Sequence, residues 1–525
     1  MTQNADHDII IVGGGHNGLT SAAYLADAGI DVLILERRDV VGGAAVTEEL
    51  IPGFRFSTAS MFCGMLQPKV VEDLNLRDYG YDAYSVDPPY TFMFPDNSYL
   101  CAWKDPDLFR REMEKFSPKD ADAFFEQQRF MQRYQEYIRP YFLRKPPSVA
   151  EFASQFKTQE EEEAYRMIMF GSAGHFALDN YESDAVRIMA AGLAASGNDV
   201  SLFSKGNMFK ALWANMADAT GEQGVWGYSR GGMGAITQAM AASAEARGAT
   251  IRTGAEIEQI LVEGDRARGV VLTSGEVVRA RAVVSNADPK RTFLKLVPGE
   301  HVQSGIKRDV DSYKMRGNFA KVFVALDARP EWACFQGEDP GSRDQGFIAM
   351  APSIEFVEES RVQALRGEIP DKIWCFIHIQ SLTDDSLAPP GKHTLTCYFQ
   401  HVPYQLAEGS WDDDSKKREL SERCLDHLRQ YVTNLDDIMI DSVTFGPRDI
   451  EDRFYLTEAT MHHGDMSPDQ MFSLRPFAGY SDYRTPVKNL YMCGAGAFPG
   501  GAVSGAPGHN AAHEIIKDWR EGLID

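Results

Sequence analysis

The start of the chain alternates short apolar runs with a longer stretch of helical pattern. Residues 8–12 (DIIIV) and 32–35 (VLIL) are apolar runs of strand length, and the alanine-rich stretch 20–29 (TSAAYLADAG) lies between them. The second run ends at Glu36. This order of strand, helix and strand predicts the first unit of an α/β fold with a parallel sheet.

Two later parts of the chain have patterns that fit the same sheet. Residues 488–492 (KNLYM) are typical of a strand, and the stretch from Gly508 to Trp519 is typical of a helix with Pro507 near its first turn. Residues 231–248 predict a glycine-started helix. After it come a strand, a hairpin turning at Ser274 and Gly275, and a final buried strand before residue 286. A β-meander inserted in a parallel sheet fits FAD-binding folds better than simple NAD-binding ones.

Two insertions separate these parts and predict a second, mixed domain. The first, 76–221, has a mainly helical pattern, and the second, 301–479, contains strand-like runs at 318–326, 372–380 and 394–401. The expected apolar-face residues of the first are Phe109, Met113, Phe116, Phe124, Phe125, Phe130 and Met131, and those of a helix in the second are Leu420, Cys424, Leu428 and Val432.

We therefore expect a discontinuous Rossmann-like FAD-binding domain and a discontinuous substrate-binding domain. The first is assembled from 1–75, 222–300 and 480–525, and the second from 76–221 and 301–479. The sheet of the second domain is expected to form the floor of a cavity beside the cofactor.

Composition narrows the classes of function. The 525 residues are 44% hydrophobic and carry a formal net charge of −23, which argues against nucleic acid or an anionic membrane as the main partner. No apolar run is long enough to predict a transmembrane helix, and the first strand starts too early for a signal peptide, so we expect a cytoplasmic protein. The seven cysteines are scattered without a C-x-x-C pair or zinc-like spacing, and we expect no metal site.

Glycines between the first strand and helix predict a phosphate cradle. Gly13 allows a tight turn, Gly15 lets the backbone approach a pyrophosphate, and Gly18 lets the helix pack on the strand. The start of the helix offers free N–H groups and the positive end of its dipole. Glu36 stands where an acid should bind ribose hydroxyls.

A second glycine-rich segment follows the strand predicted at 488–492. Gly494, Gly496, Gly500 and Gly501 again permit close approach of the backbone to a ligand. A nicotinamide dehydrogenase needs one phosphate cradle, whereas a protein that holds FAD lengthwise also needs backbone contacts for the ribityl chain and the ring. The sequence therefore predicts FAD.

Several longer sequence motifs resemble those of a known superfamily. They are VGGGHNGL, LERRDVVGGAAVTEELIPGFRFS, SRGGMGAITQA, VVSNADP, HHGDMSPDQMFSLRP and GAGAFPGGAVSGAPGHNAA. With them the chain resembles the flavin amine oxidase and phytoene desaturase (carotenoid dehydrogenase) superfamily of FAD oxidoreductases. Amine oxidases of this superfamily usually carry an arginine after the paired glycines, but here Gly42 and Gly43 precede Ala44. The resemblance is therefore to the desaturase-like branch.

The resemblance implies FAD contacts along the whole chain. In the first part they fall on Gly13, Gly15, Gly18, Glu36, Arg37, Gly43 and Ala44. In the later parts they fall on Ile257, Asn286, Ala287, Asp288, Gly494, Ala495, Gly496, Gly501, Ala502 and Val503.

Candidate catalytic residues are His463, His462, Tyr228 and Arg230. The two histidines lie in a loop-like context, and imidazole can orient or deprotonate a substrate near neutral pH. The alternative is that they are packing residues. Family position implies that Tyr228 and Arg230 approach the cavity, whereas Arg230 is equally suited to pair with a carboxylate.

Three further residues have open interpretations. His175 either lines the substrate cavity or is a satisfied helical histidine, and His16 is expected only to occupy a variable position of the phosphate turn. Arg475 either contacts an acidic substrate or caps a strand. The stretch 129–145 is either an amphipathic helix ended by Pro140 and Pro146 or a segment that contacts a membrane surface.

The sequence favours an FAD-dependent oxidoreductase that takes a hydride from a largely apolar or lipid-like substrate. Alternatives are a flavin-dependent redox-neutral isomerase, a non-catalytic flavin-bound regulatory protein and a simple NAD dehydrogenase. The sequence leaves the electron acceptor open: a quinone, oxygen or another acceptor. We expect at most peripheral membrane contact, and the sequence leaves homo-oligomers and protein partners open.

Overall fold

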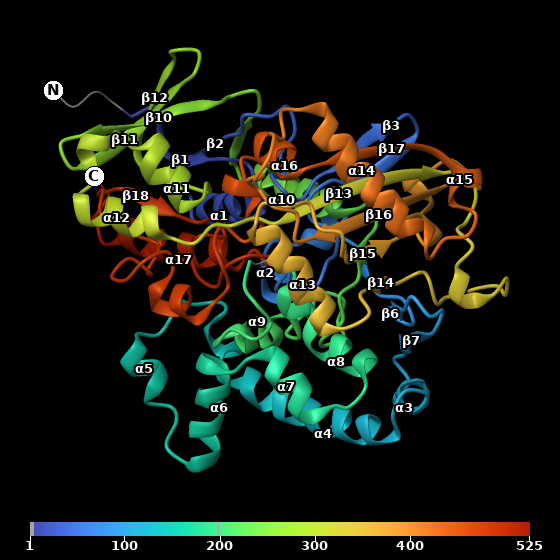
Figure 1. The fold of residues 1–525 in the computed structure, drawn as a ribbon. Helices are drawn as coiled ribbons and strands as arrows, with labels where there is room; N and C mark the ends of the chain where they lie inside the picture. The colour runs from blue at the N-terminus through green and yellow to red at the C-terminus, as the bar shows by residue number, and fades with distance from the viewer. Residues whose placement is uncertain (1–4, 198, 525) are drawn as a thin grey trace.

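Three distant parts of the chain build one largely parallel sheet. The computed structural model describes residues 5–197 and 199–524. The strands of this sheet are β1 (His7–Val12), β2 (Val32–Leu35), β9 (Thr250–Arg252), β10 (Ile257–Glu263), β11 (Arg266–Leu272), β12 (Val277–Ser285) and β18 (Leu490–Met492). Their order is β10-β11-β12-β1-β2-β9, with β18 beside β12. The α/β fold with a parallel sheet and β-meander is confirmed (Figure 1).

The central strand β1 is buried because helices and the meander cover its two faces. Ile9 and Ile11 pack with α1 (His16–Asp27), α10 (Met233–Ala246) and α17 (Ala506–Arg520). Ile10 and Val12 pack on the other side with residues of the meander. This alternation is the two-residue period of a strand.

The meander differs in one detail from the expected pattern. The hairpin turns where expected, since the Gly275 N–H donates to the Leu272 carbonyl at 2.8 Å. The second strand of the hairpin and the expected final buried strand are one continuous strand, β12. It pairs with β11 in the hairpin and then with β1 in the parallel sheet.

The second large sheet is mostly antiparallel and joins both insertions. Its order is β17 (Met439–Phe445), β13 (Phe319–Leu326), β16 (His393–Gln400), β15 (Cys375–His378), β14 (Phe347–Met350), β6 (Tyr90–Met93) and β7 (Tyr99–Ala102). The edge strands β6 and β7 come from the first insertion, which is therefore less purely helical than its pattern predicted.

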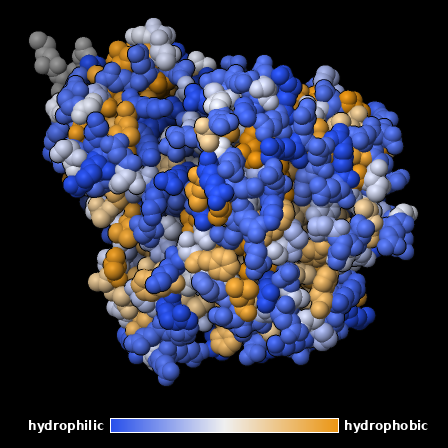
Figure 2. Space-filling view, viewed as in Figure 1, coloured by the Kyte–Doolittle hydropathy of each residue, from blue (hydrophilic) through white to orange (hydrophobic). Residues whose placement is uncertain are grey.

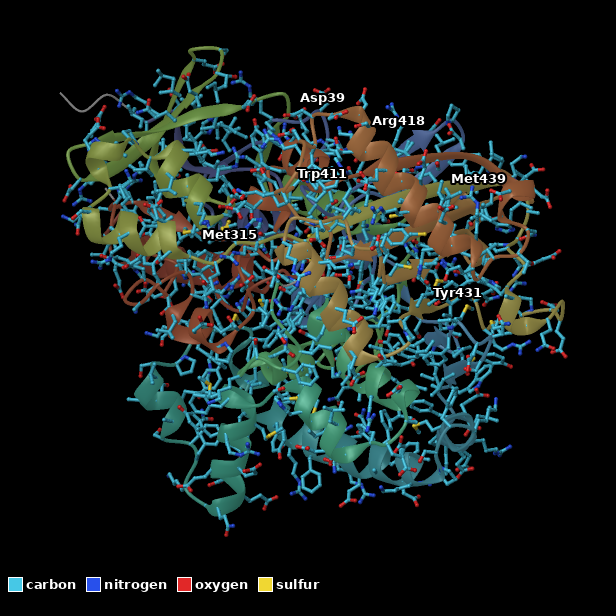
Figure 3. All side chains as sticks on the ribbon, viewed as in Figure 1. Asp39, Met315, Trp411, Arg418, Tyr431 and Met439 are labelled. Carbon is cyan, nitrogen blue, oxygen red and sulfur yellow. The ribbon has the colours of Figure 1, made fainter. Side chains whose placement is uncertain are left out.

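One face of this sheet packs against α14 (Asp414–Arg429), whose Leu420, Cys424 and Leu428 join the strands in one apolar cluster. Trp411 and Tyr431, labelled in Figure 3, extend that cluster beyond the two ends of α14. Val432 also belongs to it but lies past the end of the helix.

A layer of helices from the first insertion covers the other face and forms the lower part of Figure 1. These helices are α3 (Pro106–Glu114), α4 (Pro118–Glu136), α5 (Val149–Ala153), α6 (Gln159–Phe170), α7 (Ala173–Asn180), α8 (Asp184–Ala191) and α9 (Asn207–Ala214). Of the expected apolar-face residues, Met113, Phe124 and Met131 are buried, and Phe130 is only partly buried. In the stretch 129–145, the expected helix end at Pro140 comes slightly earlier, because α4 ends at Glu136 and a 3-10 turn that contains Pro140 follows at Arg139–Tyr141.

The remaining elements are short or peripheral. They are β3 (Thr47–Ile51), β4 (Phe54–Ser57), β5 (Ala83–Tyr84), β8 (Tyr228–Ser229), α2 (Pro68–Asp73), α11 (Pro289–Arg291), α12 (Ser304–Ser312), α13 (Ile354–Leu365), α15 (Leu435–Ile438) and α16 (Pro447–Phe454). In Figure 2 the visible face is mostly hydrophilic, with apolar residues in small separate groups. No helix within the described ranges has the length and apolar character needed to span a bilayer.

Glycines allow α1 to pack closely against α17 and against the turn after β1. A Cβ on Gly508 would lie 2.2 Å from the Asn17 carbonyl oxygen, and one on Gly18 would lie 2.4 Å from the Gly13 carbonyl oxygen. Both contacts are with backbone atoms, which have little freedom to give way. The packing role expected of Gly18 agrees with this geometry.

We predict that Gly508→Ala lowers the free energy of unfolding by about 1–3 kcal/mol, because the added methyl overpacks the α1–α17 contact. Denaturant unfolding followed by circular dichroism measures the change. The control is Gly305→Ala in α12, where no atom lies within 4 Å of the new Cβ. Equal stability of the two variants would contradict the packing argument.

Candidate active site

A single elongated cavity connects the two large sheets. It encloses ≈ 290 Å³ and starts at Val12 and Leu35, the carboxyl ends of β1 and β2. It ends against Phe319, Phe376 and Tyr398 of the second sheet. The open edge of a parallel sheet therefore faces a wall built by the insertions, a common place for a ligand in α/β folds.

The backbone at the first end is packed too closely for side chains. A Cβ on Gly15 would lie 2.7 Å from Asn286 Nδ2, and Asn286 donates from that nitrogen to the Gly13 carbonyl at 3.3 Å. Gly43 lies against Gly15: a Cβ on Gly43 would lie 3.2 Å from the Gly15 Cα. The helix α1 starts after Gly15 with no side-chain cap and no acidic residue in its first turn. Its free N–H groups suit a phosphate.

Glu36 organises this turn. Its buried carboxylate accepts the Gly14 N–H at 2.8 Å and the Arg38 N–H at 2.9 Å. Each carboxylate oxygen accepts more than one hydrogen bond, so the group keeps capacity for ribose hydroxyls.

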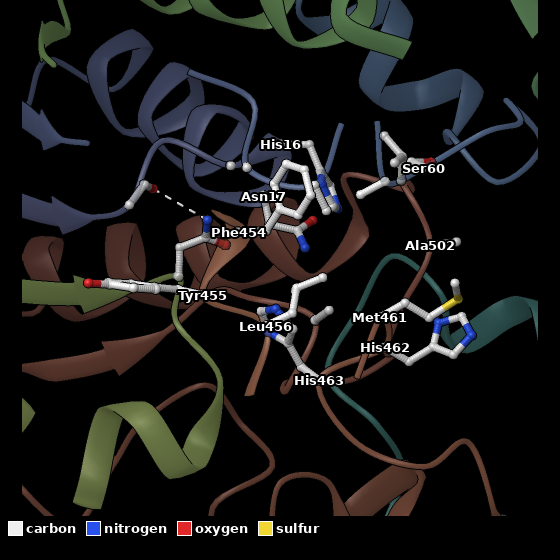
Figure 4. A pocket seen from close by; sticks show the side chains of 18 of the residues that line it. His16, Asn17, Ser60, Phe454, Tyr455, Leu456, Met461, His462, His463 and Ala502 are labelled. Carbon is white, nitrogen blue, oxygen red and sulfur yellow. Dashed lines mark hydrogen bonds between the residues drawn. The ribbon is translucent and has the colours of Figure 1, made fainter. Parts of the chain in front are cut away.

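Next to Glu36, an arginine holds a covering segment. The Arg37 guanidinium lies 3.7 Å from the centre of the Tyr455 ring and donates to the Asp452 carbonyl at 2.8 Å. Arg291 lies at the same distance from that ring, and the Tyr455 hydroxyl donates to Glu256. The end of α16 is thereby fixed over the cavity, and Tyr455, labelled in Figure 4, lines it. The sequence offered no signal for Tyr455.

The C-terminal segment contributes to the wall in two ways. Ala495, Ala502 and Val503 line the cavity. Gly494 and Gly501 are not among the described lining residues. Their lack of side chains lets the segment pack closely. A Cβ on Gly494 would lie 2.5 Å from the Asn286 carbonyl oxygen, and a Cβ on Gly501 would lie 2.0 Å from His462 Nδ1.

Two other expected cofactor contacts also lie behind the wall. A Cβ on Gly496 would lie 2.5 Å from Pro289 Cδ. Asp288 caps α11, accepting the Arg291 N–H at 2.9 Å and the Thr457 hydroxyl at 2.6 Å. Neither is among the described residues lining the cavity, whereas Ile257, Ala287 and Ala44 are.

Both histidines of the HHG motif line the cavity, and their rings point apart (Figure 4). His462 Nε2 lies 2.8 Å from Lys210 Nζ. Burial, followed by the charges of Lys210 and Arg475, holds the pKa of His462 well below its ordinary value. Burial also lowers the pKa of His463.

His16 was expected only to occupy a variable position of the phosphate turn. In the structure it lines the cavity, and burial together with nearby His463 lowers its pKa to about 4. His175 is not among the described lining residues, and its Nδ1 lies 3.0 Å from Ser172 Oγ.

The structure places Tyr228 and Arg230 outside the cavity. The Tyr228 hydroxyl donates to the Gln345 carbonyl at 3.1 Å, and its ring stacks on His378. Arg230 is exposed and pairs with Asp82 at 3.2 Å. Neither is among the described lining residues, and both have protein partners, so this geometry supports structural roles for both.

Arg475 neither reaches the cavity nor caps a strand. Its fully buried guanidinium donates to the carbonyls of His462 at 2.5 Å, Ala495 at 2.7 Å and Asp465 at 3.1 Å. It ties the HHG loop to the C-terminal glycine segment.

The far end of the cavity is aromatic. The ring centres of Phe62 and Phe347 are 4.6 Å apart, those of Phe347 and Phe376 are 4.4 Å apart, and those of Phe319 and Tyr398 are 4.8 Å apart. Four of these rings come from neighbouring strands, β13 to β16, and Tyr398 pairs with Phe376 in register. We call these five residues the aromatic wall. Alternation along the predicted strands was the available signal, but it does not show which face meets the cavity.

The donor set at the first end fits FAD. Several cavity-lining side chains carry buried polar atoms without a hydrogen-bond partner among the described residues, as expected where a polar ligand supplies the partners. They are His16 Nε2, Asn17 Oδ1, Arg38 Nη1, Arg291 Nε and His463 Nδ1. A glycine cradle, a ribose-binding acid and an elongated trough match a dinucleotide flavin bound lengthwise.

Comparisons with known proteins agree with this geometry. The profile of the family described as flavin containing amine oxidoreductase matches residues 18–516. Pyridine nucleotide-disulfide oxidoreductase domain-containing protein 2 of Mus musculus is 32% identical over 98% of this chain and 94% of its own. The phytoene desaturase (neurosporene-forming) of Cereibacter sphaeroides is 26% identical over 95% and 92%, and a limonene dehydrogenase chain of Castellaniella defragrans is 26% identical over 99% and 96%.

Among solved structures, putrescine oxidase bound to putrescine has a TM-score of 0.62 at 15% identity, covering 98% of this chain and 99% of its own. That likeness concerns the fold alone. The superfamily resemblance seen in the sequence motifs is confirmed, and so are the flavoprotein fold class and FAD as cofactor.

We predict that Glu36→Ala weakens FAD binding about 10- to 100-fold, because the ribose hydroxyls lose a charged acceptor worth about 1–3 kcal/mol and the turn held by the Gly14 and Arg38 N–H groups loses its anchor. Titration of the apoprotein with FAD, followed by flavin fluorescence, measures the Kd. The control is Glu72→Ala, an exposed carboxylate on α2. An unchanged Kd in Glu36→Ala would refute the assignment of Glu36.

Proposed function

The chain belongs to the family of flavin-containing amine oxidoreductases, and from this premise we propose that it is an FAD-dependent dehydrogenase of the desaturase type. Its substrate is a largely apolar organic molecule that loses a hydride and a neighbouring proton. The observation that carries this proposal is the aromatic wall, which shares one cavity with the dinucleotide cradle.

The cofactor-binding residues in this proposal occupy the first half of the cavity. Gly13, Gly15, Gly43 and Ala44 provide backbone approach, and Glu36 binds the ribose. Asn286, Ala287, Ala495, Ala502 and Val503 form the facing wall, and Arg37 holds the cover over it. When bound, FAD supplies a two-electron acceptor for hydride.

The charges that line the cavity favour an apolar substrate over an amine. Among the described lining residues the acidic side chains are Glu36 and Glu256, both at the nucleotide end. A cationic amine at the aromatic wall would therefore have no carboxylate partner, and burying an unpaired charge is costly. Lys210, a cation when protonated, also lines the cavity, beside His462. Ala44 in place of the arginine usual in amine oxidases points the same way.

The aromatic wall gives the apolar substrate its contact surface and excludes water from the reacting carbons. Stacked and edge-on rings bind flat or unsaturated molecules with little loss of side-chain freedom. His462 and His463 are the catalytic candidates of the sequence that stay in this proposal, because they line the cavity, whereas Tyr228 and Arg230 do not.

The remaining parts of the proposal concern the surroundings of the enzyme. Electrons leave to a quinone or to oxygen. The chain acts in the cytoplasm with at most peripheral membrane contact, either alone or as a homo-oligomer. The alternatives are a flavin-dependent isomerase and a non-catalytic flavin-bound partner protein. Whether a substrate reduces the bound flavin distinguishes them from the dehydrogenase.

We predict that limonene or phytoene reduces the bound flavin without oxygen, bleaching its absorbance near about 450 nm, whereas putrescine does not. Stopped-flow mixing of the anaerobic holoenzyme with each compound measures the rate. The reason is the absence of acidic groups at the aromatic wall among the described lining residues.

Bleaching by putrescine alone would contradict the apolar assignment. Conversion of an alkene to its isomer with no bleaching would favour the isomerase. A flavin that none of these compounds reduces or converts counts against the proposed function and favours the binding protein.

A further inference from the structure

A buried lysine opens into the cavity beside the HHG loop. Lys210 belongs to α9, in which every residue is buried, and its own side chain lines the cavity. Its Nζ lies 2.8 Å from His462 Nε2 and 4.3 Å from the centre of the Trp213 ring. Among the described residues, the contacts of its amine therefore include the His462 ring nitrogen and the aromatic face of Trp213.

The surroundings of Lys210 decide its charge. Burial and, after it, the charge of Arg475 lower the pKa of Lys210 to about 7. Among the described residues, the titratable or charged groups shown to act on its amine are His462, at hydrogen-bond distance, and Arg475. Both are basic, so a neutral amine is favoured, and a base with a pKa near the working pH is the most effective one.

His462 cannot take this role itself. The charges of Lys210 and Arg475 add to burial in holding its pKa well below the ordinary value. Its Nδ1 has no partner among the described residues and faces Gly501. Its Nε2, by contrast, is aimed at Lys210 and accepts a hydrogen bond whenever Lys210 is an ammonium.

We propose that Lys210 is the catalytic base of this enzyme and that His462 is its positioning partner. This inference rests on the proposed function. One C–H bond of the substrate breaks and its hydride leaves with both electrons, for which FAD, when bound, would supply the acceptor. The adjacent C–H bond breaks, its electron pair forms the new C=C bond, and its proton goes to Lys210 Nζ. The substrate loses two electrons that FAD gains, and the proton later leaves to water.

Two contacts stabilise the ammonium that this step creates. His462 Nε2 accepts a hydrogen bond from it at the observed 2.8 Å, and the Trp213 face lies within cation–π distance. Arg475 opposes the charge and so helps the proton to leave afterwards. The same geometry therefore serves both the uptake and the release of the proton.

The state of Lys210 can be measured without substrate. Competitive acetylation of the FAD-loaded protein across pH 5–10, followed by mass spectrometry, gives the pH at which each lysine becomes reactive. We expect the reactivity of Lys210 to inflect near pH 7, well below the ordinary lysine value of about 10.4. An inflection of Lys210 above pH 9 would overturn the proposal.

The kinetic test uses anaerobic flavin reduction by limonene. In the natural protein the rate should rise with pH through about 7, because the neutral amine is the active form. Lys210→Met and Lys210→Arg should lose roughly 10²- to 10⁴-fold and the pH dependence with it, with the flavin spectrum unchanged. His462→Gln, which keeps an acceptor, should keep more activity than His462→Phe. Lys205→Met is the matched control.

The outcomes separate this inference from the proposed function. Suppose that limonene reduces the flavin of the natural protein, and that Lys210→Met keeps the natural rate and the natural pH profile. The assignment of Lys210 as the base is then wrong, and the proposed function stands. If neither limonene nor phytoene reduces the parent flavin, the proposed function fails and the base fails with it. Loss of FAD from Lys210→Met would assign Lys210 to cofactor binding and also overturn the proposal.

Discussion

The structure depends on the close approach of three backbone segments around Asn286. The side chain of Asn286 donates to the Gly13 carbonyl, and its own carbonyl oxygen would lie 2.5 Å from a Cβ on Gly494. The backbone N–H of Asn286 donates to the Val12 carbonyl at 3.0 Å. Parts of the chain separated by hundreds of residues can meet there only because glycines leave room. The dinucleotide end of the cavity exists through this contact.

The cavity changes character along its length, and that gradient decides its chemistry. At the end of β1 and β2 it presents backbone N–H groups, a buried carboxylate and unpartnered polar atoms. Under the second sheet it presents rings from neighbouring strands. A polar, anionic cofactor and an apolar substrate are thus bound in one space without competing for the same contacts.

The HHG loop connects these two ends. Arg475, fully buried, holds the His462 and Ala495 carbonyls together, and so joins the loop to the C-terminal glycine segment. Its charge is compensated mainly by carbonyl dipoles, which leaves the neighbourhood electropositive. Burial and, after it, the charge of Arg475 lower the pKa of Lys210, and burial with the charges of Lys210 and Arg475 lowers the pKa of His462.

The sequence alone determined the parts of this protein that depend on local pattern. The strand–glycine–helix unit at Gly13 to Gly18, the acid at residue 36 and the terminal helix all need particular residues at short spacing, so their signals are visible in the chain. Only the tertiary structure decided which of the expected glycines touch the cavity, since Gly15 lines it and Gly496 packs behind it. It also paired the Tyr228 hydroxyl with the Gln345 carbonyl and brought Lys210, a lysine in an otherwise largely apolar helix, to within 2.8 Å of His462. Such contacts join residues 252 positions apart, and no local pattern specifies them, because they arise from the packing of whole elements.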